Sequence, residues 1–391
     1  MEKPKIRFLK NKHSWVRNTF EEIAKRRTKS SDNPDLPRIE YQDIISGEGR
    51  LNKDLNKNID YRKGIVFETN DILYGKLRPY LKNWLHPNFN GIALGDFWVL
   101  QARNCDSKFL FSLVQSPKFQ RVANDTSGTK MPRSDWKTIS QTEFSIPSSN
   151  EEQSAIGSLF RTLDDLLASY KDNLANYQSL KATMLSKMFP KAGQTVPEIR
   201  LDGFEGEWEV VNLGTLIENY DEIISGASGF PIATSSRKGL YLQNDYFEGG
   251  RTGIDLTLDF HRVPMGYVTY RHMSDDSIFK FNKNNFETDV LVSKEYPVFI
   301  SNDSSDIDFL LYHLNNSRLF LRFSTMQKLG GTRVRLYYKN LITYKLAVPT
   351  VKEQQAIGTY FSNLDNLINS YQDKILQLET LKKKLLQDMF I

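Results

Sequence analysis

The sequence is poor in the residues on which many catalytic and metal-binding proteins depend. Among its 391 residues it has one cysteine, Cys105, and five histidines without metal-ligand spacing. This pattern excludes a disulfide framework and predicts no metal site. No apolar run reaches the roughly 18 residues that cross a bilayer, and the basic segment 1–12 lacks the apolar core of a signal peptide. We therefore expect a cytoplasmic protein in a reducing compartment, with Cys105 as an inert thiol.

Sequence elements of several enzyme classes are also absent. The chain has no Gly-x-x-x-x-Gly-Lys-Ser/Thr loop for nucleoside triphosphates, no Asn-Pro-Pro-aromatic element of adenine methyltransferases, and no Gly-x-Gly turn that opens a helix after a strand. Asp135-Trp136-Lys137 matches a nuclease element only as a short pattern that arises by chance. Gly226-Ala227-Ser228-Gly229 lacks the context and partner histidine of a nucleophile elbow. The sequence thus predicts no catalytic, cofactor-binding or metal-ligating residue.

What the chain does contain is an internal repeat. Residues 152–189 and 353–390 align without a gap at an offset of 201, with 17 identities in 38 positions. Each copy follows a proline and opens with Glu-Gln-x-Ala-Ile-Gly. A second match opens each half: a Pro-x-Ile-Arg segment with a tryptophan eleven residues after the proline, Trp15 in one half and Trp208 in the other. Such self-similarity predicts two similar halves.

Both repeat copies predict a long helix with a coiled-coil seam. Their apolar residues alternate steps of four and three over three heptads, a period of 3.5 residues that is typical of coiled coils. The expected seam consists of Ile156, Phe160, Leu163, Leu167, Tyr170, Leu174 and Tyr177 in the first copy, and of Ile357, Phe361, Leu364, Ile368, Tyr371, Ile375 and Leu378 in the second. Both seams are expected to slip by one step of three and to continue at Leu180, Met184 and Met188 in the first copy and at Leu381, Leu385 and Met389 in the second. Asn150 with Gln153, and Thr350 with Glu353, predict capping boxes at the helix starts.

Outside the helices the sequence predicts α+β domains. Short β-branched runs such as 64–69 and 289–293 favour strands, whereas 108–122 and 306–323 favour amphipathic helices. We therefore expect globular domains at 1–149 and 191–349, a central helix at 150–190 and a distal helix at 350–391.

Positive charge gathers at the same place in both domains. The net charge of +5 is the sum of +9 in residues 1–150, −1 in residues 151–190, −3 in residues 191–350 and zero in residues 351–391. Residues 309–350 nevertheless carry seven basic side chains and no acidic one, and residues 107–142 carry a net +4. Each stretch surrounds a Gly-Thr pair, Gly128-Thr129 or Gly331-Thr332. A Lys/Arg run is most often a solvated face, but its repetition in two diverged domains favours a surface that contacts phosphate groups.

Two diverged α+β domains, each followed by a near-identical long helix, resemble the specificity (S) subunit of type I restriction–modification enzymes. Segment 71–80 (Asp-Ile-Leu-Tyr-Gly-Lys-Leu-Arg-Pro-Tyr) is similar to that family's mid-domain segment, and Ser127-Gly128-Thr129 to its loop before the last strands. Trp15 and Trp208 lie where its recognition domains begin. The second domain departs from the pattern, since His272-Met273 replaces the Lys-Leu-Arg-Pro run and Gly330 stands where Ser127 would.

The resemblance implies two similar globular target-recognition domains separated by two long α-helices, packed as an antiparallel coiled coil with a pseudo-two-fold internal repeat. The chain would be a reader that is non-catalytic by itself, and each domain would recognise one half of a bipartite target in double-stranded DNA. The helices would set the spacer between the halves and dock two modification (methyltransferase) subunits, with restriction (translocase/nuclease) subunits joining them. This chain would bind no cofactor, because S-adenosylmethionine, ATP and Mg would belong to the partner subunits.

Base readout is expected near the Gly-Thr loops, where most basic side chains would contact phosphates. The residues expected to contact DNA are Lys76, Arg78, Lys130, Arg133, Lys137, Lys328, Arg333 and Arg335. Two other functions stay open at this point. The chain could be a coiled-coil interaction scaffold without DNA sequence reading, which would lack the steep salt dependence of DNA binding. It could also be an enzyme with an unrecognised site, which would be active without partners.

Overall fold

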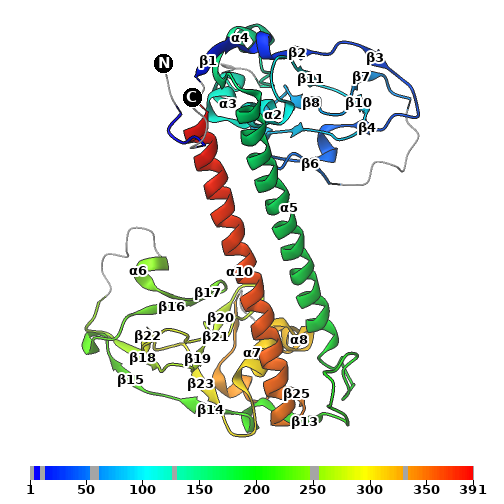
Figure 1. Cartoon of the computed structure of the whole chain (residues 1–391). Coiled ribbons are helices and arrows are strands. Elements are labelled where there is room, and N and C mark those ends of the chain that lie inside the picture. The colour runs from blue at the N-terminus through cyan, green and yellow to red at the C-terminus, as the bar shows by residue number, and fades with distance from the viewer. Residues whose placement is uncertain are drawn as a thin grey trace. The chain divides into compact units, whose positions relative to one another are not determined.

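The computed structural model describes residues 4–8, 14–52, 61–125, 130–246, 255–328 and 333–390. The chain forms two compact units, which we call unit 1 (Met1–Leu174 and Ser370–Ile391) and unit 2 (Ala175–Asn369). Each unit mixes helices and sheets, as expected, and each contains part of both long helices (Figure 1).

Unit 1 begins and ends its globular part on one antiparallel pair of strands. Its elements before the first long helix are β1 (Trp15–Thr19), α1 (Phe20–Ile23), β2 (Ala24–Arg26), β3 (Ser30–Ser31), β4 (Arg38–Ile39), η1 (Tyr41–Asp43), β5 (Ile44–Ile45), β6 (Arg50–Leu51), β7 (Gly64–Phe67), β8 (Ile72–Gly75), η2 (Pro79–Leu81), β9 (Trp84–Leu85), β10 (Gly91–Ala93), β11 (Phe97–Ala102), α2 (Ser107–Gln115), α3 (Pro117–Ala123), α4 (Trp136–Gln141) and β12 (Glu143–Pro147). Strand β1 pairs with β12, while two four-stranded sheets run in the orders β2-β11-β8-β9 and β3-β7-β10-β4. Strands β5 and β6 form a separate hairpin.

Unit 2 repeats this plan with different side chains. Its elements are β13 (Glu209–Asn212), η3 (Leu213–Thr215), β14 (Ile217–Tyr220), β15 (Ile223–Ser225), η4 (Gly226–Ser228), β16 (Ala233–Ser236), β17 (Gly239–Leu242), α6 (Gln243–Tyr246), β18 (Asp259–Val263), β19 (Val268–Thr269), β20 (Met273–Ser274), β21 (Asn282–Lys283), β22 (Val290–Ser293), β23 (Val298–Ser301), α7 (Ile307–Asn316), α8 (Arg318–Met326), β24 (Val334–Arg335), α9 (Tyr338–Leu341) and β25 (Lys345–Val348). The pair β13-β25 corresponds to β1-β12, and the sheet β14-β23-β19-β21 corresponds to β2-β11-β8-β9. The remaining sheets are β15-β18-β22, β16-β17 and β20-β24. The strands expected at 64–69 and 289–293 are confirmed as β7 and β22.

The long helices are α5 (Asn150–Lys187, 38 residues) and α10 (Val351–Met389, 39 residues). In unit 1 the ring of Phe160 lies 5.7 Å from that of Phe390, and the ring of Tyr170 lies 5.3 Å from that of Tyr371. Residue numbers rise on one helix as they fall on the other, so the two segments pack antiparallel. Unit 2 shows the same direction, because Lys181 pairs with Asp365 and the ring of Phe189 lies 6.3 Å from that of Phe361.

Burial along the expected seam is graded. The first four seam residues of each copy are at most 8% exposed, and the others are partly buried. The expected continuation is wrong at Leu180 and Leu381, which are 42% and 45% exposed, but Met188 and Met389 are buried, and Met184 and Leu385 are partly buried. The neighbouring lysines turn inward instead: Lys382 pairs with Asp164 at 2.5 Å in unit 1, and Lys181 pairs with Asp365 in unit 2. Both pairs join residues that the repeat duplicates at its offset of 201.

The duplicated Glu-Gln-x-Ala-Ile-Gly motif anchors each long helix to its globular part. The Glu152 carboxylate, fully buried, accepts hydrogen bonds from Arg7 Nε at 2.6 Å and Nη2 at 2.7 Å. The Glu353 carboxylate accepts the same two bonds from Arg200, at 2.7 and 2.6 Å. These arginines close the Pro-x-Ile-Arg segments, so a single ion pair explains why the two sequence matches occur together.

The glutamine of the motif, Gln153 in unit 1, connects the end of β12 to the start of α2. Gln153 Nε2 donates to the Pro147 carbonyl at 2.9 Å, and its Oε1 accepts from the Asp106 amide at 2.8 Å. Gln354 repeats both bonds in unit 2, at 2.9 and 3.0 Å. The motif glycine lets α2 approach closely, since a Cβ on Gly157 would lie 2.5 Å from the Phe109 amide nitrogen.

Two helix predictions need correction. The hydroxyl of Ser149, not Asn150, caps α5 by accepting from the Glu152 amide at 3.3 Å, because Gln153 is committed to Pro147 and Asp106. In α10 the Thr350 hydroxyl does accept from the Glu353 amide at 3.4 Å, but the Glu353 side chain binds Arg200 instead of closing a box. The single helices expected at 108–122 and 306–323 are each two helices, because an extended serine, Ser116 or Ser317, ends one and caps the next.

Candidate nucleic-acid interface

In unit 1 the fold brings together three of the basic residues expected to contact DNA. The Lys76 carbonyl accepts from the Ser134 amide at 2.8 Å, and the Arg78 amide donates to the Pro132 carbonyl at 2.7 Å. These bonds hold the segment after β8 against the segment before α4. Lys76, Arg78 and Arg133 therefore lie on two neighbouring segments, which are joined by an isolated antiparallel bridge.

A single carboxylate organises this cluster. Asp96 lies 3.5 Å from Lys76 Nζ and 3.2 Å from Arg133 Nη2. Partial burial alone would raise the pKa of Asp96. The pKa nevertheless lies below its ordinary value, because Arg133 and Lys76 stabilise the ionised form. Because one carboxylate faces two cations, this cluster keeps a net positive charge.

The turn that follows β8 has an unusual backbone. Arg78 and Lys82 both adopt the left-handed conformation, with φ of 49° and 53°, although neither is glycine. Such backbones cost about 1–3 kcal/mol each and cluster at functional sites. Between them Tyr80 is 56% exposed and Leu81 39% exposed. The turn therefore presents an aromatic ring between two exposed basic side chains.

The remaining expected residues of unit 1 are exposed but less closely tied to this cluster. Lys130 lies three residues before Arg133, and Lys137 lies in the first turn of α4. Ser127, Gly128 and Thr129, and the corresponding Gly330, Gly331 and Thr332, fall outside the described residues.

Unit 2 places its own residues in the same arrangement. The His272 carbonyl accepts from the Leu336 amide at 2.8 Å, which is the counterpart of the bond between Lys76 and Ser134. Arg335, exposed in β24, therefore occupies the position of Arg133. Arg333 Nε lies 2.8 Å from Asp275 Oδ1, and Lys328 is exposed just after α8.

The charge of the two surfaces differs. In unit 2 the turn after β20 carries Asp275 and Asp276, and Asp276 accepts two hydrogen bonds from the Arg237 guanidinium. These bonds lower the pKa of Asp276 to about 2, so it is ionised at neutral pH. Acidic side chains thus neutralise much of this turn, whereas the turn in unit 1 is purely basic.

Nearby aromatic side chains have mixed roles. Trp136 packs edge-on against Trp98 at 5.3 Å and lies beneath the Arg26 guanidinium, so it belongs to the core. Tyr337 is 42% exposed and stacks on His272 at 5.4 Å. Tyr338 is partly buried and lies against Phe299.

The surroundings of Asp135 and Cys105 indicate structural roles and not catalytic ones. Asp135 caps α4 by accepting from the Thr138 amide at 2.8 Å. Burial, together with nearby Asp106, raises the pKa of Cys105 to about 12, which disfavours the reactive thiolate. Among the described residues no cluster of three or more His, Cys, Asp or Glu could hold a metal ion. No described helix combines the length and apolarity needed to cross a membrane.

Comparison with known proteins identifies the family. The type I restriction modification DNA specificity domain matches the chain twice, over residues 15–176 and 238–380. The chain belongs to this family. The two matches correspond to the two halves of the repeat, and each includes part of one long helix.

Curated specificity subunits are similar to this family member over different shares of their length. The type I restriction enzyme MjaVIII specificity subunit of Methanocaldococcus jannaschii is 23% identical over 355 residues, covering 83% of this chain and 79% of that protein. The EcoDI specificity subunit of Escherichia coli is 25% identical over 190 residues, covering 46% of this chain and 42% of that protein. The solved S subunit of a type I restriction-modification system from M. genitalium has a similar fold, with a TM-score of 0.60, 13% identity and coverage of 100% and 99%.

Some residues of this specificity-domain surface were not predicted from the sequence. Asp96 lies twenty positions from Lys76, and Arg237 lies far from Asp276, so their pairing depends on the tertiary fold. The exposure of Tyr80 is partly signalled by its place after Arg78-Pro79 in a polar turn, but the left-handed backbone on either side of it is not.

Proposed function

We propose that this chain is the DNA sequence-specificity subunit of a type I restriction–modification complex and is itself non-catalytic. Each unit recognises one half of a bipartite target. The observation that carries the proposal is that the family's DNA specificity domain occurs twice, with Arg133 and Arg335 at equivalent positions of two differently charged surfaces. Two surfaces that share a fold but differ in charge are suited to two half-sites of different sequence.

The helices are proposed to form an antiparallel coiled coil that sets the spacing of the half-sites. The support is the antiparallel packing found in each unit and the duplicated Asp–Lys pairs that fix its register. At 1.5 Å per residue, helices of 38 and 39 residues are about 57–59 Å long. Their length would then determine the number of base pairs between the half-sites.

Partner subunits are proposed to supply the chemistry. Two modification subunits would bring S-adenosylmethionine, and restriction subunits would bring ATP and Mg. The curated relatives are named specificity subunits of restriction enzymes, which supports the same division of labour for this chain. The chain would act in the cytoplasm.

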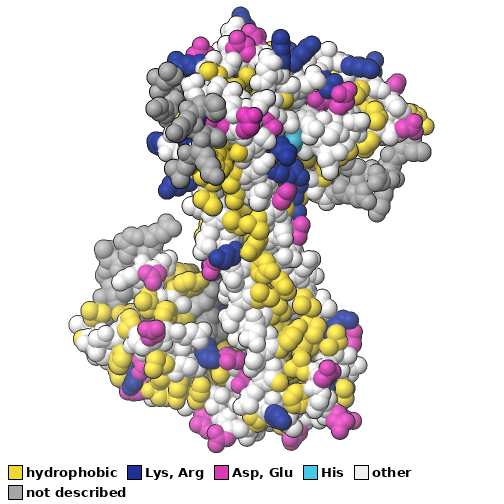
Figure 2. Space-filling model, in the orientation of Figure 1, with side chains coloured by type: hydrophobic (Ala, Val, Ile, Leu, Met, Phe, Trp, Pro, Cys, Tyr) yellow, Lys and Arg dark blue, Asp and Glu magenta, His cyan; other side chains and the backbone are white. Residues whose placement is uncertain are grey.

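Exposed leucines suggest where the modification subunits dock. In unit 1, Leu166 and Leu381 are 39% and 45% exposed and lie within two residues of Asp164 and Lys382 in the sequence. In unit 2 the equivalent Leu367 and Leu180 are 37% and 42% exposed and lie within two residues of Asp365 and Lys181. On the face shown in Figure 2, hydrophobic side chains gather along the long helices. Two equivalent apolar surfaces suit two copies of one partner.

Docking is testable by stoichiometry. Leu166→Glu with Leu381→Glu is expected to reduce the modification subunits bound per chain from two to one in native mass spectrometry, because a charge there cannot be buried at little cost. The matched pair Leu180→Glu with Leu367→Glu should remove the other copy, and all four changes both. Gln355→Glu, at an exposed position of α10, is the control. Two subunits retained by the fourfold variant would contradict this docking surface.

DNA contact by the basic surface is testable by salt dependence. Arg133→Gln is expected to weaken binding of target DNA and to reduce the slope of log K against log salt by about one, as for the loss of one phosphate contact. Arg335→Gln should do the same through unit 2, and Lys352→Gln, exposed at the start of α10, should change neither. The measurement is fluorescence anisotropy of labelled duplex over a range of salt concentrations, with the assembled complex.

The target itself shows whether the chain reads sequence. Sequencing of methylated bases in cells with and without the chain should reveal a split motif that depends on it. Exchange of residues 197–350 for those of another specificity subunit should change only one half of that motif. No chain-dependent motif, together with a flat salt dependence, would favour the interaction scaffold instead.

A further inference from the structure

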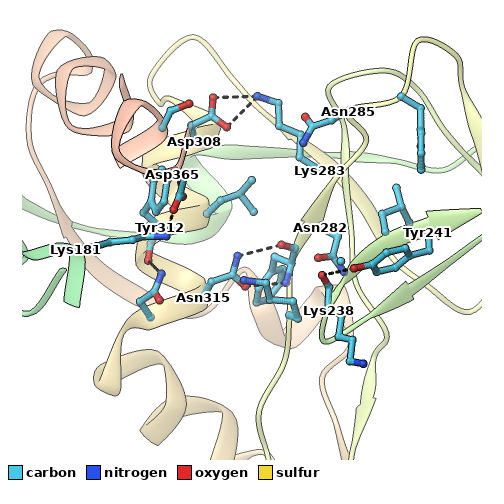
Figure 3. Close-up of a pocket in the computed structure, with 18 residues that line it drawn as sticks. Lys181, Lys238, Tyr241, Asn282, Lys283, Asn285, Asp308, Tyr312, Asn315 and Asp365 are labelled. Carbon is cyan, nitrogen blue, oxygen red and sulfur yellow. Dashed lines mark hydrogen bonds and ion pairs between the residues drawn. The ribbon is translucent and has the colours of Figure 1, made fainter. Parts of the chain in front are cut away.

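Unit 2 contains a polar pocket of about 630 Å³ that no step of the proposed function uses. Its walls are the β16-β17 hairpin, the segment around β21, helix α7 and parts of both long helices (Figure 3). Four lysines and two aspartates line it, so the pocket carries an excess of two positive charges.

Each of the two aspartates already pairs with a lysine of the pocket. Asp308 accepts from Lys283 Nζ at 2.9 and 3.0 Å, and Asp365 pairs with Lys181 and accepts from the Tyr312 hydroxyl at 2.8 Å. Figure 3 shows these two groups on the helical side of the pocket. Their charges are therefore balanced without any ligand.

The other two lysines are not balanced. In the part of the chain that the structure describes, no carboxylate lies within ion-pair distance of Lys238 or Lys280. Lys280 is partly buried, and its pKa lies below the ordinary value because burial, and then the nearby Lys181, disfavour the charged form more than Asp365, beyond ion-pair distance, favours it. A partly buried cation whose nearest carboxylate already pairs with another lysine is costly, and an anion in the pocket would offset that cost.

The walls around Lys280 are held rigidly. The Asn315 side chain accepts from the Phe281 amide at 2.9 Å and donates to the Phe281 carbonyl at 3.0 Å. Asn282 Nδ2 donates to Ser235 Oγ at 2.8 Å and to the Ser236 carbonyl at 2.9 Å. These bonds fix the residues that follow Lys280 against α7 and β16, so binding would require little reorganisation.

Aromatic rings lie at the rim. Tyr241 lines the pocket and donates from its hydroxyl to the Lys238 carbonyl at 3.0 Å. Its ring centre lies 5.9 Å from that of Tyr246, and the two side chains are 36% and 43% exposed. Exposed aromatic faces next to lysines are suited to a nucleobase with an attached phosphate.

The corresponding pocket of unit 1 has different chemistry. It measures about 400 Å³ and is built around the equivalent Asp164–Lys382 pair, but Trp84, Leu167 and Leu386 line it. Its partly buried Lys171 lies 3.0 Å from Glu48 and 2.7 Å from Glu379. Among the described lining residues of the two pockets, a partly buried lysine without an ion-pair partner therefore occurs in unit 2 and not in unit 1, which argues against a partner surface common to both halves.

We propose that the pocket of unit 2 binds a phosphate-bearing ligand, with Lys280 and Lys238 contacting the phosphate and Tyr241 the attached base. Two sources have this chemistry, a free nucleotide and the backbone of a DNA strand. A free nucleotide would be a second ligand beyond DNA, whereas a DNA phosphate would extend the proposed contact surface and would rest on the proposed function.

The test uses the full chain with three probes: ATP, inorganic phosphate and duplex DNA that carries the target. If a free nucleotide is the ligand, ATP binds in calorimetry, and Lys280→Gln weakens it by roughly tenfold or more, as for the loss of a charged hydrogen bond, while DNA affinity stays unchanged. If DNA is the source, Lys280→Gln lowers DNA affinity and reduces its salt slope by about one. The control is Lys294→Gln, exposed elsewhere in unit 2.

Lys238→Gln, at an exposed hairpin position, repeats the test should Lys280→Gln impair folding. The proposal is overturned if the wild-type chain binds neither ATP nor phosphate and both lysine variants leave DNA affinity and salt slope unchanged. Failure of sequence-specific DNA binding in the wild-type chain is a different result. It would remove the proposed function while the ATP and phosphate arms still judge the pocket.

Discussion

Replacement of Arg200 by methionine is expected to lower the free energy of unfolding of unit 2 by about 3–5 kcal/mol, the usual cost of breaking a buried ion pair from one side. The Glu353 side chain is 1% exposed and receives both bonds of the Arg200 guanidinium, at 2.7 and 2.6 Å. Without Arg200 a carboxylate would stay buried without its cation. Hydrogen exchange measured by mass spectrometry on peptides that cover β25 and α7 would report the loss for this unit alone.

Two variants sharpen that experiment. Arg7→Met in unit 1 should cost less, because Trp15 Nε1 still donates to Glu152 at 3.3 Å, whereas Trp208 Nε1 is buried and makes no hydrogen bond within the described structure. Arg200→Met combined with Glu353→Met should recover much of the loss, because the buried charge is gone. A double variant as unstable as the single one would show that packing of the Arg200 side chain, not charge, stabilises the site.

Both units are expected to lose stability in mild acid through a buried histidine. Burial lowers the pKa of His313 in unit 2 to about 4, and burial, followed by the nearby Arg161, lowers that of His86 in unit 1 to about 4. The unfolded chain takes up these protons near pH 6.5, but the folded chain does so only near pH 4. The unfolded state therefore binds more protons in this window, and stability falls as pH falls, by about 3 kcal/mol for each histidine.

The prediction is specific to each unit. His313→Gln should flatten the pH dependence of hydrogen exchange in unit 2 between pH 6.5 and 4 and leave that of unit 1 unchanged; a glutamine can keep a hydrogen bond to the Tyr344 hydroxyl, which lies 2.8 Å from His313 Nε2. His86→Phe, beside Phe111, should flatten only unit 1. An unchanged slope in unit 2 of the His313→Gln protein would mean that other groups cause its acid sensitivity.

The long helices could be predicted closely because their signal is local and is repeated. A period of 3.5 residues and a duplicated sequence predicted helices at 150–190 and 350–391, and the structure has them at Asn150–Lys187 and Val351–Met389. Sequence pattern failed where a tertiary contact decided the outcome. Leu180 and Leu381 fit the apolar period but are exposed, because Lys181 and Lys382 next to them turn inward to aspartates of the other helix.

Of the candidate site, the sequence could predict only which stretches are rich in basic residues. Counting charges located basic stretches in both domains, and the fold places Lys76, Arg78 and Arg133 together. The sequence could not show that Asp96 is shared by two of them, because the three residues lie in segments that are separate in the sequence and meet only in the fold. The pocket of unit 2 was not predictable either, since its walls come from five separate segments between Lys181 and Asp365.

The division of the chain also bears on the order in which the protein can fold during synthesis. Unit 2 is one continuous stretch, whereas the core of unit 1 includes Met389 and Phe390 packed with residues such as Phe109 and Phe160. At ribosomal rates of about 5–20 residues per second, these last residues follow Leu174 by roughly 10–40 s. The first unit to emerge is therefore the last to be completed, and the apolar side of its α5 segment must wait, uncovered or shielded by a chaperone, until unit 2 has been made.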